Sequence, residues 1–240
     1  MKIVALEIKH SFGERENLIY PAAAMDENEL VLIDCGYPGD LSYIENAAGE
    51  HDIDINRLTK IIITHHDYDH MGALGAFKRK YPKVQVISSV IEADYISGKK
   101  KSLRLQQAEK LQELLTEAEQ EQGRRFMAQL EAIENVPVDL WVEDKAVLPC
   151  CGGMEIIATP GHMPGHICVY LKESKTLIAG DAMVVNGGEL LMANPQYTLD
   201  MEGAKASVEK LLDYEIDTIL CYHGGICSGN IKEKLQKILK

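Results

Sequence analysis

Three short histidine clusters, each directly after an apolar segment, carry most of the chemistry that this sequence could perform. They hold six of the eight histidines, in residues 65–70, in residues 162–166 and around His223. The densest is His65-His66-Asp67-Tyr68-Asp69-His70, which sets two carboxylates among three imidazoles. Groups of these types, crowded together, are costly to hold without a cation between them. The clusters therefore predict a metal site.

The spacing within the first cluster divides its residues between two metal ions. In an extended loop, residues two apart face the same side, so His65 and Asp67 can bind one ion. A turn after Asp67 would direct Asp69 and His70 towards a second ion a few ångströms away. The strand-end aspartate Asp181 joins the set because it lies between the other two histidine clusters along the chain.

Short apolar segments rich in β-branched residues precede the clusters and are typical of buried strands. We predict strands at 1–8, 30–34, 60–64, 84–87, 154–159, 167–171, 176–179 and 218–221, and helices at 71–80, at 201–212 and from 231 onward. Strand–helix–strand order with fully apolar strands favours an α/β fold whose sheet is covered on both faces.

Residues 99–135 break this strand rhythm with long polar runs and no proline. Apolar residues recur there at helical spacing on either side of Gly123, which predicts a helical hairpin with one helix on each side of that glycine. The hairpin either packs on the domain or covers a substrate cleft, and both interpretations stay open. Since no repeat or flexible linker is present, we predict a single domain, 1–240, with a helical insertion at about 99–135.

Composition restricts the partners that can be expected. With 25 basic and 37 acidic residues the net charge is −12, which repels phosphate backbones and anionic membranes. We therefore expect no nucleic acid, no membrane and a small-molecule substrate, and the oligomeric state stays unknown. None of the six cysteines forms a Cys-x-x-Cys pair, which favours the reducing cytoplasm as the compartment.

The motifs, in this order, resemble those of the metallo-β-lactamase fold superfamily over most of the chain. That family carries His-x-His-x-Asp-His after a strand, then Pro-Gly-His-x-x-Gly-His, then Gly-Asp, then a final histidine. The corresponding segments here are 65–70, 160–166, Gly180-Asp181 and His223. The resemblance implies a four-layer αββα sandwich with a dinuclear metal site at the edges of the sheets.

Carried over by position, the resemblance implies seven metal ligands: His65, Asp67, Asp69, His70, His162, Asp181 and His223. The first ion would be held by His65, Asp67 and His162. The second would be held by Asp69, His70 and His223, with Asp181 bridging the two. In this scheme His166 is structural, and the strand-end Asp34 orients the site without binding a metal.

Asp67 stands where the family has its second histidine. A carboxylate is a harder ligand than an imidazole and adds negative charge, which shifts preference from Zn towards Fe or Mn. We therefore expect two divalent metal ions, with Zn first and Fe or Mn as alternatives. The flavodiiron branch of the fold is similar in having a carboxylate at this position. Alternatively, His66 replaces the missing imidazole through a changed loop path.

The resemblance implies a metal-dependent hydrolase. In it a metal-bridging hydroxide attacks the carbonyl of a small-molecule ester, lactone, thioester or amide, and Asp69 is the catalytic residue that orients the water. The alternatives are an iron-dependent oxidoreductase of the same fold and a non-catalytic metal-stabilised binding protein. Against the first stands the absence of a flavin-binding half. Against the second stand seven ligand positions that all hold metal-capable residues. The insertion and the 192–197 segment are expected to wall the substrate pocket.

Overall fold

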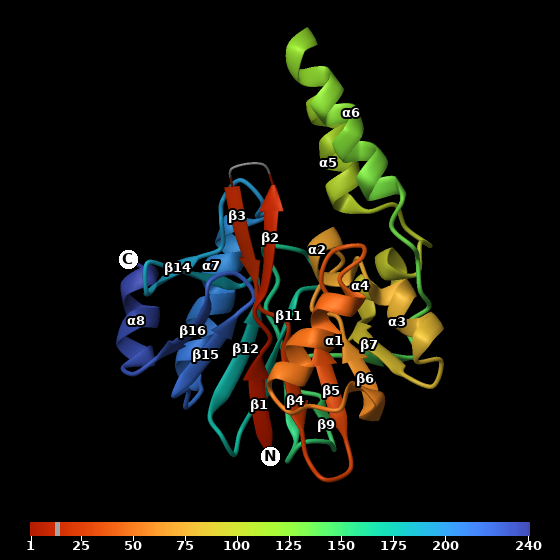
Figure 1. Ribbon diagram of the computed structural model, residues 1–240. Helices are drawn as coiled ribbons and strands as arrows, with labels where there is room; N and C mark the ends of the chain where they lie inside the picture. Colours follow the sequence, from red (N-terminus) through yellow and green to blue (C-terminus); the bar gives the residue numbers. More distant parts are fainter. Residues whose placement is uncertain (13–14) are drawn as a thin grey trace.

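Two six-stranded sheets form the centre of the molecule. The computed structural model describes residues 1–12 and 15–240, and Figure 1 shows how the elements are arranged. The first sheet has the order β1-β4-β5-β6-β7-β8 and the second β16-β15-β12-β11-β10-β9. The strands of the first sheet are β1 (Lys2–Ala5), β4 (Ala22–Met25), β5 (Leu30–Ile33), β6 (Leu58–Ile62), β7 (Gln85–Ser89) and β8 (Leu140–Val142). Those of the second are β9 (Val147–Leu148), β10 (Met154–Ala158), β11 (Ile167–Leu171), β12 (Thr176–Gly180), β15 (Thr218–Cys221) and β16 (Gly225–Ser228).

Helices cover the outer face of each sheet and complete four layers. The first sheet is accompanied by α1 (Leu41–Glu50), η1 (Ile55–Arg57), α2 (Tyr68–Met71), α3 (Leu74–Lys80) and α4 (Val90–Ile96), and the second by α7 (Met201–Lys210), η2 (Leu211–Asp213) and α8 (Ile231–Ile238). Two small hairpins lie outside the sheets, β2–β3 (Ile8–Phe12 and Arg15–Ile19) and β13–β14 (Met183–Asn186 and Glu189–Met192). The αββα sandwich implied by the resemblance is therefore confirmed.

Alternation along the buried strands builds the layers. In β5, Leu32 faces the core beneath the helices of the first sheet, whereas Val31 and Ile33 face the core between the two sheets. In β11, Val169 belongs to the central core and Cys168 to the core under α7 and α8. Successive strand residues point to opposite faces, so a strand that is apolar throughout must be covered on both sides.

Most predicted strands lie within a few residues of their observed positions. The prediction for Gly123 was wrong, because this glycine does not divide the hairpin. It lies inside α6 (Glu117–Glu131), and the turn from α5 (Leu103–Gln112) is made by residues 113–116. A Cβ at position 123 would come within 2.1 Å of Gln112 Oε1, so the glycine permits close approach of the two helices. The single-domain boundary, 1–240, stays a prediction.

The helical hairpin itself is present within the predicted insertion and projects from the body near α2 and α4 (Figure 1). Its second helix starts with a reciprocal cap, in which the Thr116 backbone N–H donates to the Glu119 carboxylate at 3.1 Å. Leu111 and Leu114 near the turn are exposed, whereas Leu103 and Arg104 at the base lie against the body. No helix among the described residues is long and apolar enough to cross a bilayer.

Candidate metal centre

The three histidine clusters meet at one edge of the sandwich. Residues 65–70 follow β6, residues 159–166 connect β10 to β11, and Asp181 and His223 follow β12 and β15. Since β5 and β6 run parallel, as do β12 and β15, their carboxyl ends lie at the same side of each sheet. This topology gathers side chains that are more than 150 residues apart in the sequence.

One group of candidate ligands consists of His65, Asp67 and His162. Their ligand atoms all lie within 4.8 Å of one another, and all three side chains are buried. Asp67 Oδ2 is 3.1 Å from His162 Nε2 and 3.5 Å from His65 Nε2. These are the residues expected to hold the first ion.

A second group consists of Asp69, His70 and His223, whose ligand atoms also lie within 4.8 Å of one another. Asp69 Oδ2 is 3.2 Å from His223 Nε2 and 3.8 Å from His70 Nε2. Their membership matches the set expected for the second ion. This side of the centre is the more open one, because the His223 side chain is 28% exposed and that of Asp69 13%.

Asp181 lies between the two groups. Its Oδ2 is 3.6 Å from both His162 Nε2 and His223 Nε2, and its Oδ1 is 3.4 Å from His70 Nε2. The carboxylate thus approaches one histidine of the first group and two of the second. This is the position that a bridging ligand requires. A further trio of suitable spacing, formed by His65, His70 and Asp181, overlaps both groups.

The donor set fits divalent metal ions. Among the described residues, four of the five buried side-chain nitrogen or oxygen atoms without a hydrogen-bond partner belong to this cluster: His65 Nε2, His70 Nε2, His162 Nδ1 and Asp181 Oδ1. Leaving such atoms unpaired costs about 1–3 kcal/mol each. Imidazole nitrogens and carboxylate oxygens are ligands of Zn, Fe and Mn, so bound ions would satisfy His65 Nε2, His70 Nε2 and Asp181 Oδ1, which the protein leaves unpaired.

Asp34 orients two of the histidines. It follows β5 with a left-handed backbone (φ 61°), and its carboxylate accepts from the Thr64 N–H, the Thr64 hydroxyl and His70 Nδ1, each at 2.8 Å. Because the Thr64 hydroxyl donates to Asp34, its oxygen is left to accept from His65 Nδ1 at 3.0 Å. Both histidines therefore turn Nε2 towards the cluster, and Asp34 has the orienting position expected of it.

His166 supports the site from behind. Its Nδ1 lies 2.8 Å from the Thr159 hydroxyl, and its Nε2 accepts the backbone N–H of Asp181 at 3.0 Å. Burial lowers the pKa of His166 to about 3, so the ring stays neutral. With both ring nitrogens engaged, His166 fixes the backbone of Asp181, in agreement with the structural role expected from the sequence.

His66, the alternative to Asp67, is engaged elsewhere. Its Nδ1 is bonded to the Glu92 carboxylate, and its Nε2 accepts the Leu103 backbone N–H at 3.2 Å. The ring also stacks on Tyr95, with centroids 4.3 Å apart. Neither nitrogen is left for a metal, so the geometry favours Asp67 as the ligand.

Sequence reasoning missed Arg104, the residue that holds Asp67. This arginine of α5 is 7% exposed, and its Nε and Nη2 donate to Asp67 Oδ1 and Oδ2 at 3.1 and 2.5 Å. Nη2 also donates to the Tyr197 carbonyl at 3.0 Å. An arginine in the first turn of a charged helix gives no local signal of such a contact, because its partner is 37 residues away.

Charges within the centre shift its protonation. Burial would raise the pKa of Asp67, but hydrogen bonds with His162 and His65 and the charge of Arg104 hold that pKa well below its usual range. For Asp181 burial acts in the same direction and is outweighed by His223 and His70, so its pKa is also well below the usual range. Both carboxylates are therefore ionised and ready to bind cations.

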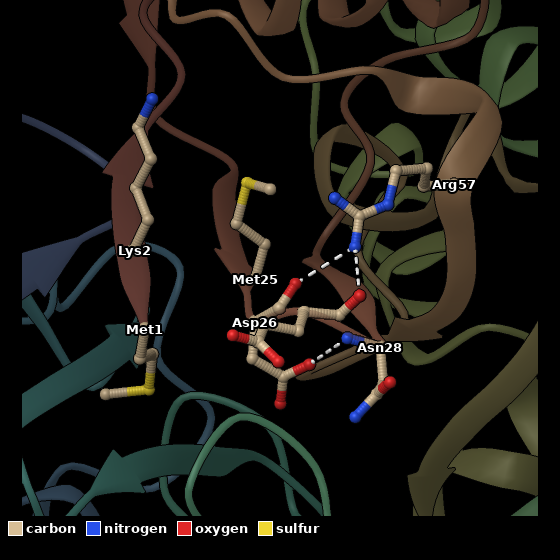
Figure 2. Close-up of a pocket in the computed structure, with 7 residues that line it drawn as sticks. Met1, Lys2, Met25, Asp26, Asn28 and Arg57 are labelled. Atoms are coloured by element: carbon tan, nitrogen blue, oxygen red, sulfur yellow. Dashed lines mark hydrogen bonds between the residues drawn. The ribbon is translucent and has the colours of Figure 1, made fainter.

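A separate cavity lies at the opposite ends of the strands of the first sheet. Its volume is about 680 Å³, and Figure 2 shows the residues that line it. They are Met1, Lys2, Met25, Asp26, Glu27, Asn28 and Arg57. Arg57 donates to the carbonyls of Asp26 and Glu27 at 3.0 and 2.8 Å, so its guanidinium is occupied by backbone acceptors.

Comparison with known proteins places these features in a family. The family model described as the metallo-beta-lactamase superfamily matches residues 20–223, which include every candidate ligand. The probable metallo-hydrolase YflN of Bacillus subtilis is 28% identical over 92% of this chain and 86% of its own length. A hydroxyacylglutathione hydrolase of Synechococcus is 29% identical over 69% of this chain. The matched region covers 50% of the length of that hydrolase.

Solved structures agree on the fold. A metallo-beta-lactamase family protein from Thermus thermophilus superimposes with a TM-score of 0.76 and 18% identity, over 99% of this chain and 78% of that one. A metallo-beta-lactamase from Pontibacter korlensis gives a TM-score of 0.69 and 15% identity, over 99% and 94% of the two chains. The family match over most of the length, together with the αββα layers and the ordered histidine clusters, shows that this chain belongs to the metallo-β-lactamase superfamily.

Proposed function

We propose that this protein is a dinuclear metal-dependent hydrolase that cleaves a carbonyl bond of a small-molecule ester, thioester, lactone or amide. The observation that carries the proposal is the convergence of seven imidazole and carboxylate side chains, among which His65 Nε2, His70 Nε2 and Asp181 Oδ1 are buried without a hydrogen-bond partner. Relatives named as metallo-hydrolases and hydroxyacylglutathione hydrolases support hydrolysis and make an acyl thioester the first substrate to test.

Two divalent ions, when bound, supply Lewis acidity that activates water and stabilises developing negative charge. His65, Asp67 and His162 would hold one ion, and Asp69, His70 and His223 the other. Asp181 would keep the two ions at a fixed spacing, since it approaches both groups. Zn is our first choice of metal, with Fe and Mn as alternatives.

Asp69 is the proposed catalytic residue. Together with His223 it forms the more exposed side of the centre, so a substrate arriving from solvent would meet these two side chains. The carboxylate of Asp69 would orient the attacking water and accept its proton. Its backbone is fixed, because the buried Tyr222 hydroxyl donates to the Asp69 carbonyl and the Tyr222 ring lies 3.8 Å from that of His70.

The helical insertion is proposed to wall the substrate pocket. Phe126 of α6 packs edge-to-face on Tyr68, with ring centroids 5.8 Å apart, and Tyr68 lies between two candidate ligands in the sequence. The base of α5 contacts the same loop through Leu103 and Arg104. A substrate bound at the open side of the centre would therefore lie close to the hairpin.

A substrate panel tests the function. Protein reconstituted with Zn, Mn or Fe would be assayed on an acyl thioester, a lactone, an aryl ester and a β-lactam. We expect turnover of at least one, abolished by chelation and restored by metal, with Asp69→Asn lowering both metal content and kcat, because Asp69 is a candidate ligand as well as the proposed catalytic residue. Metal-loaded protein that hydrolyses none of the four would contradict the proposal.

A further inference from the structure

We propose that Arg104 is a positioning residue for the metal centre, and that the Asp67–Arg104 pair together takes the place of the neutral histidine found in the family motif. The inference rests on the proposed function, because it needs Asp67 to be a metal ligand. It assigns to the insertion a role within the centre itself, in addition to any role in walling a pocket.

Arg104 and Asp67 form a two-pronged ion pair. Two donors of one guanidinium meet the two oxygens of one carboxylate, at 3.1 and 2.5 Å, in the parallel arrangement that Arg forms with carboxylates. Such a fork fixes the plane of the carboxylate as well as its position. Oδ2 is thereby held towards His162 Nε2 and His65 Nε2, where a shared ion would bind.

Arg104 is itself held in place by other contacts. Its Nη1 donates to Gln107 Oε1 at 2.8 Å, and its Nη2 also donates to the Tyr197 carbonyl. The guanidinium carbon lies 5.6 Å from the centre of the Tyr197 ring. The arginine therefore joins α5, the loop of candidate ligands at residues 65–70 and the segment before α7.

The first turn of α5 adds a second contact to the same loop. The Ser102 side chain caps the helix by accepting the Leu105 N–H. The next residue, Leu103, donates its backbone N–H to His66, directly beside Asp67. Two consecutive helix residues thus hold two consecutive loop residues, so the position of α5 determines the position of the candidate ligand.

The charges of Asp67 and Arg104 offset each other. A carboxylate in place of an imidazole adds one negative charge to the ligand set, and a buried guanidinium paired with it removes that charge again. The sequence alone implied that Asp67 adds negative charge to the ligand set, whereas the pair as a whole is neutral, like the histidine it replaces. Changing only Asp67 would leave the Arg104 guanidinium as a buried, unpaired charge beside a cation.

A double-mutant cycle tests the pairing in the full-length protein. Zn²⁺ dissociation constants would be measured by competition with a chromogenic chelator for the wild type, Asp67→His, Arg104→Leu and the double variant. Asp67→His alone leaves an unpaired guanidinium beside the ion. We therefore expect the double variant to bind Zn²⁺ at least tenfold more tightly than Asp67→His. The effect of Arg104→Leu should differ at least tenfold between the two backgrounds.

Arg104→Lys separates positioning from charge. Lysine keeps the positive charge but lacks the fork, so we expect Zn²⁺ affinity to fall at least fivefold and the visible spectrum of the Co²⁺-loaded protein to change. Lys101→Leu is the matched control, because it breaks the exposed Lys101–Glu109 pair at the base of the same hairpin and removes none of the contacts that Arg104 makes. It should alter neither affinity nor spectrum.

Four results would overturn the inference, and they have different meanings. An equal effect of Arg104→Leu with and without Asp67→His, or an unchanged Arg104→Lys, means that Arg104 does not act through Asp67, while the hydrolase proposal stands. Rescue of thermal stability in the metal-free double variant without rescue of Zn²⁺ affinity makes the pair structural only. A wild-type protein that binds no metal refutes the inference and the proposed function together.

Discussion

The two ends of the first sheet differ, because one end has a large cavity and the other has the candidate metal ligands. At the ends of its strands opposite the centre, a cavity of about 680 Å³ is lined in part by groups that already have partners, such as Arg57 on backbone carbonyls (Figure 2). Asp26 there accepts the N–H groups of Asn28, Glu29 and Cys151. At the other end, His65 Nε2, His70 Nε2 and Asp181 Oδ1 are buried without a hydrogen-bond partner.

This difference indicates where binding energy is available. Polar groups that are already hydrogen-bonded gain little binding free energy from a ligand. Buried polar atoms without a partner gain a new interaction when an ion binds to them. The metal centre should therefore respond strongly to substitution and to metal, and the cavity weakly. The predictions below test that contrast.

The largest effect is expected for His162→Ala. Loss of this side chain removes a candidate ligand of the first ion and a neighbour of Asp181. Loss of a residue that only orients a ligand lowers affinity or activity by about 10–100-fold, so loss of a ligand itself should lower them by more than about 100-fold. Metal content and hydrolysis would be measured together. His51→Ala, at an exposed position, is the control, and an active His162→Ala protein would refute the ligand assignment.

Asp34→Ala should have a smaller effect of the same kind. It removes the acceptor of His70 Nδ1 and of the Thr64 hydroxyl, so two histidines lose their fixed orientation. We expect metal affinity to fall by about 10–100-fold, measured by chelator competition. Unchanged affinity would show that the rings are held by other contacts.

How much of this centre the sequence predicts depends on the distance between partners. The histidine clusters are local patterns, and their order along the chain resembles that of a known family, so the candidate ligands, Asp34 and the αββα fold were all accessible. Arg104 was not, because the contact joins residues 37 positions apart and helical periodicity says nothing about it. Its role could only be recognised after α5 had been placed against the loop of residues 65–70.

The hairpin shows a second kind of limit. We interpreted Gly123 as the break between two helices, because glycine lowers helix stability, but tertiary packing decided otherwise. The glycine allows α6 to approach Gln112 and Leu115, whose side chains a Cβ would meet. The pattern Thr116-x-x-Glu119, a helix-start signal, marked the true boundary and was overlooked.

Metal affinity should depend on pH with a definite sign. Burial would lower the pKa of His70, but Asp181, Asp34 and Asp69 outweigh it, and the pKa lies well above the usual 6.5. The pKa of His223 is raised in the same way by Asp181 and Asp69. The stabilisation that these protonated histidines give the metal-free protein is complete below about pH 6.5 and is lost as pH rises through the raised pKa values.

Metal binding must displace those protons, so apparent affinity should increase as pH rises from about 6.5. Titration calorimetry in two buffers of different ionisation enthalpy would measure the protons released per ion. Binding at pH 6.5 without proton release would contradict this account.

The smallest effect is expected at the cavity. Arg57→Ala removes two hydrogen bonds to backbone carbonyls at an exposed position, and such surface changes usually stay within about 0.5 kcal/mol of unfolding free energy. Metal content and hydrolysis should equal those of the wild type. A variant that loses activity while keeping its metal would connect the cavity to function and remove the contrast between the two ends.

Metal stoichiometry tests the central claim most directly. Wild-type protein freed of metal, reloaded with Zn²⁺ and passed through a desalting column would be analysed for metal and protein by elemental analysis. Two groups of three ligands joined by Asp181 predict close to two ions per chain, falling towards one or none in His162→Ala. A saturated, folded wild-type protein that holds one ion or none would contradict the dinuclear centre.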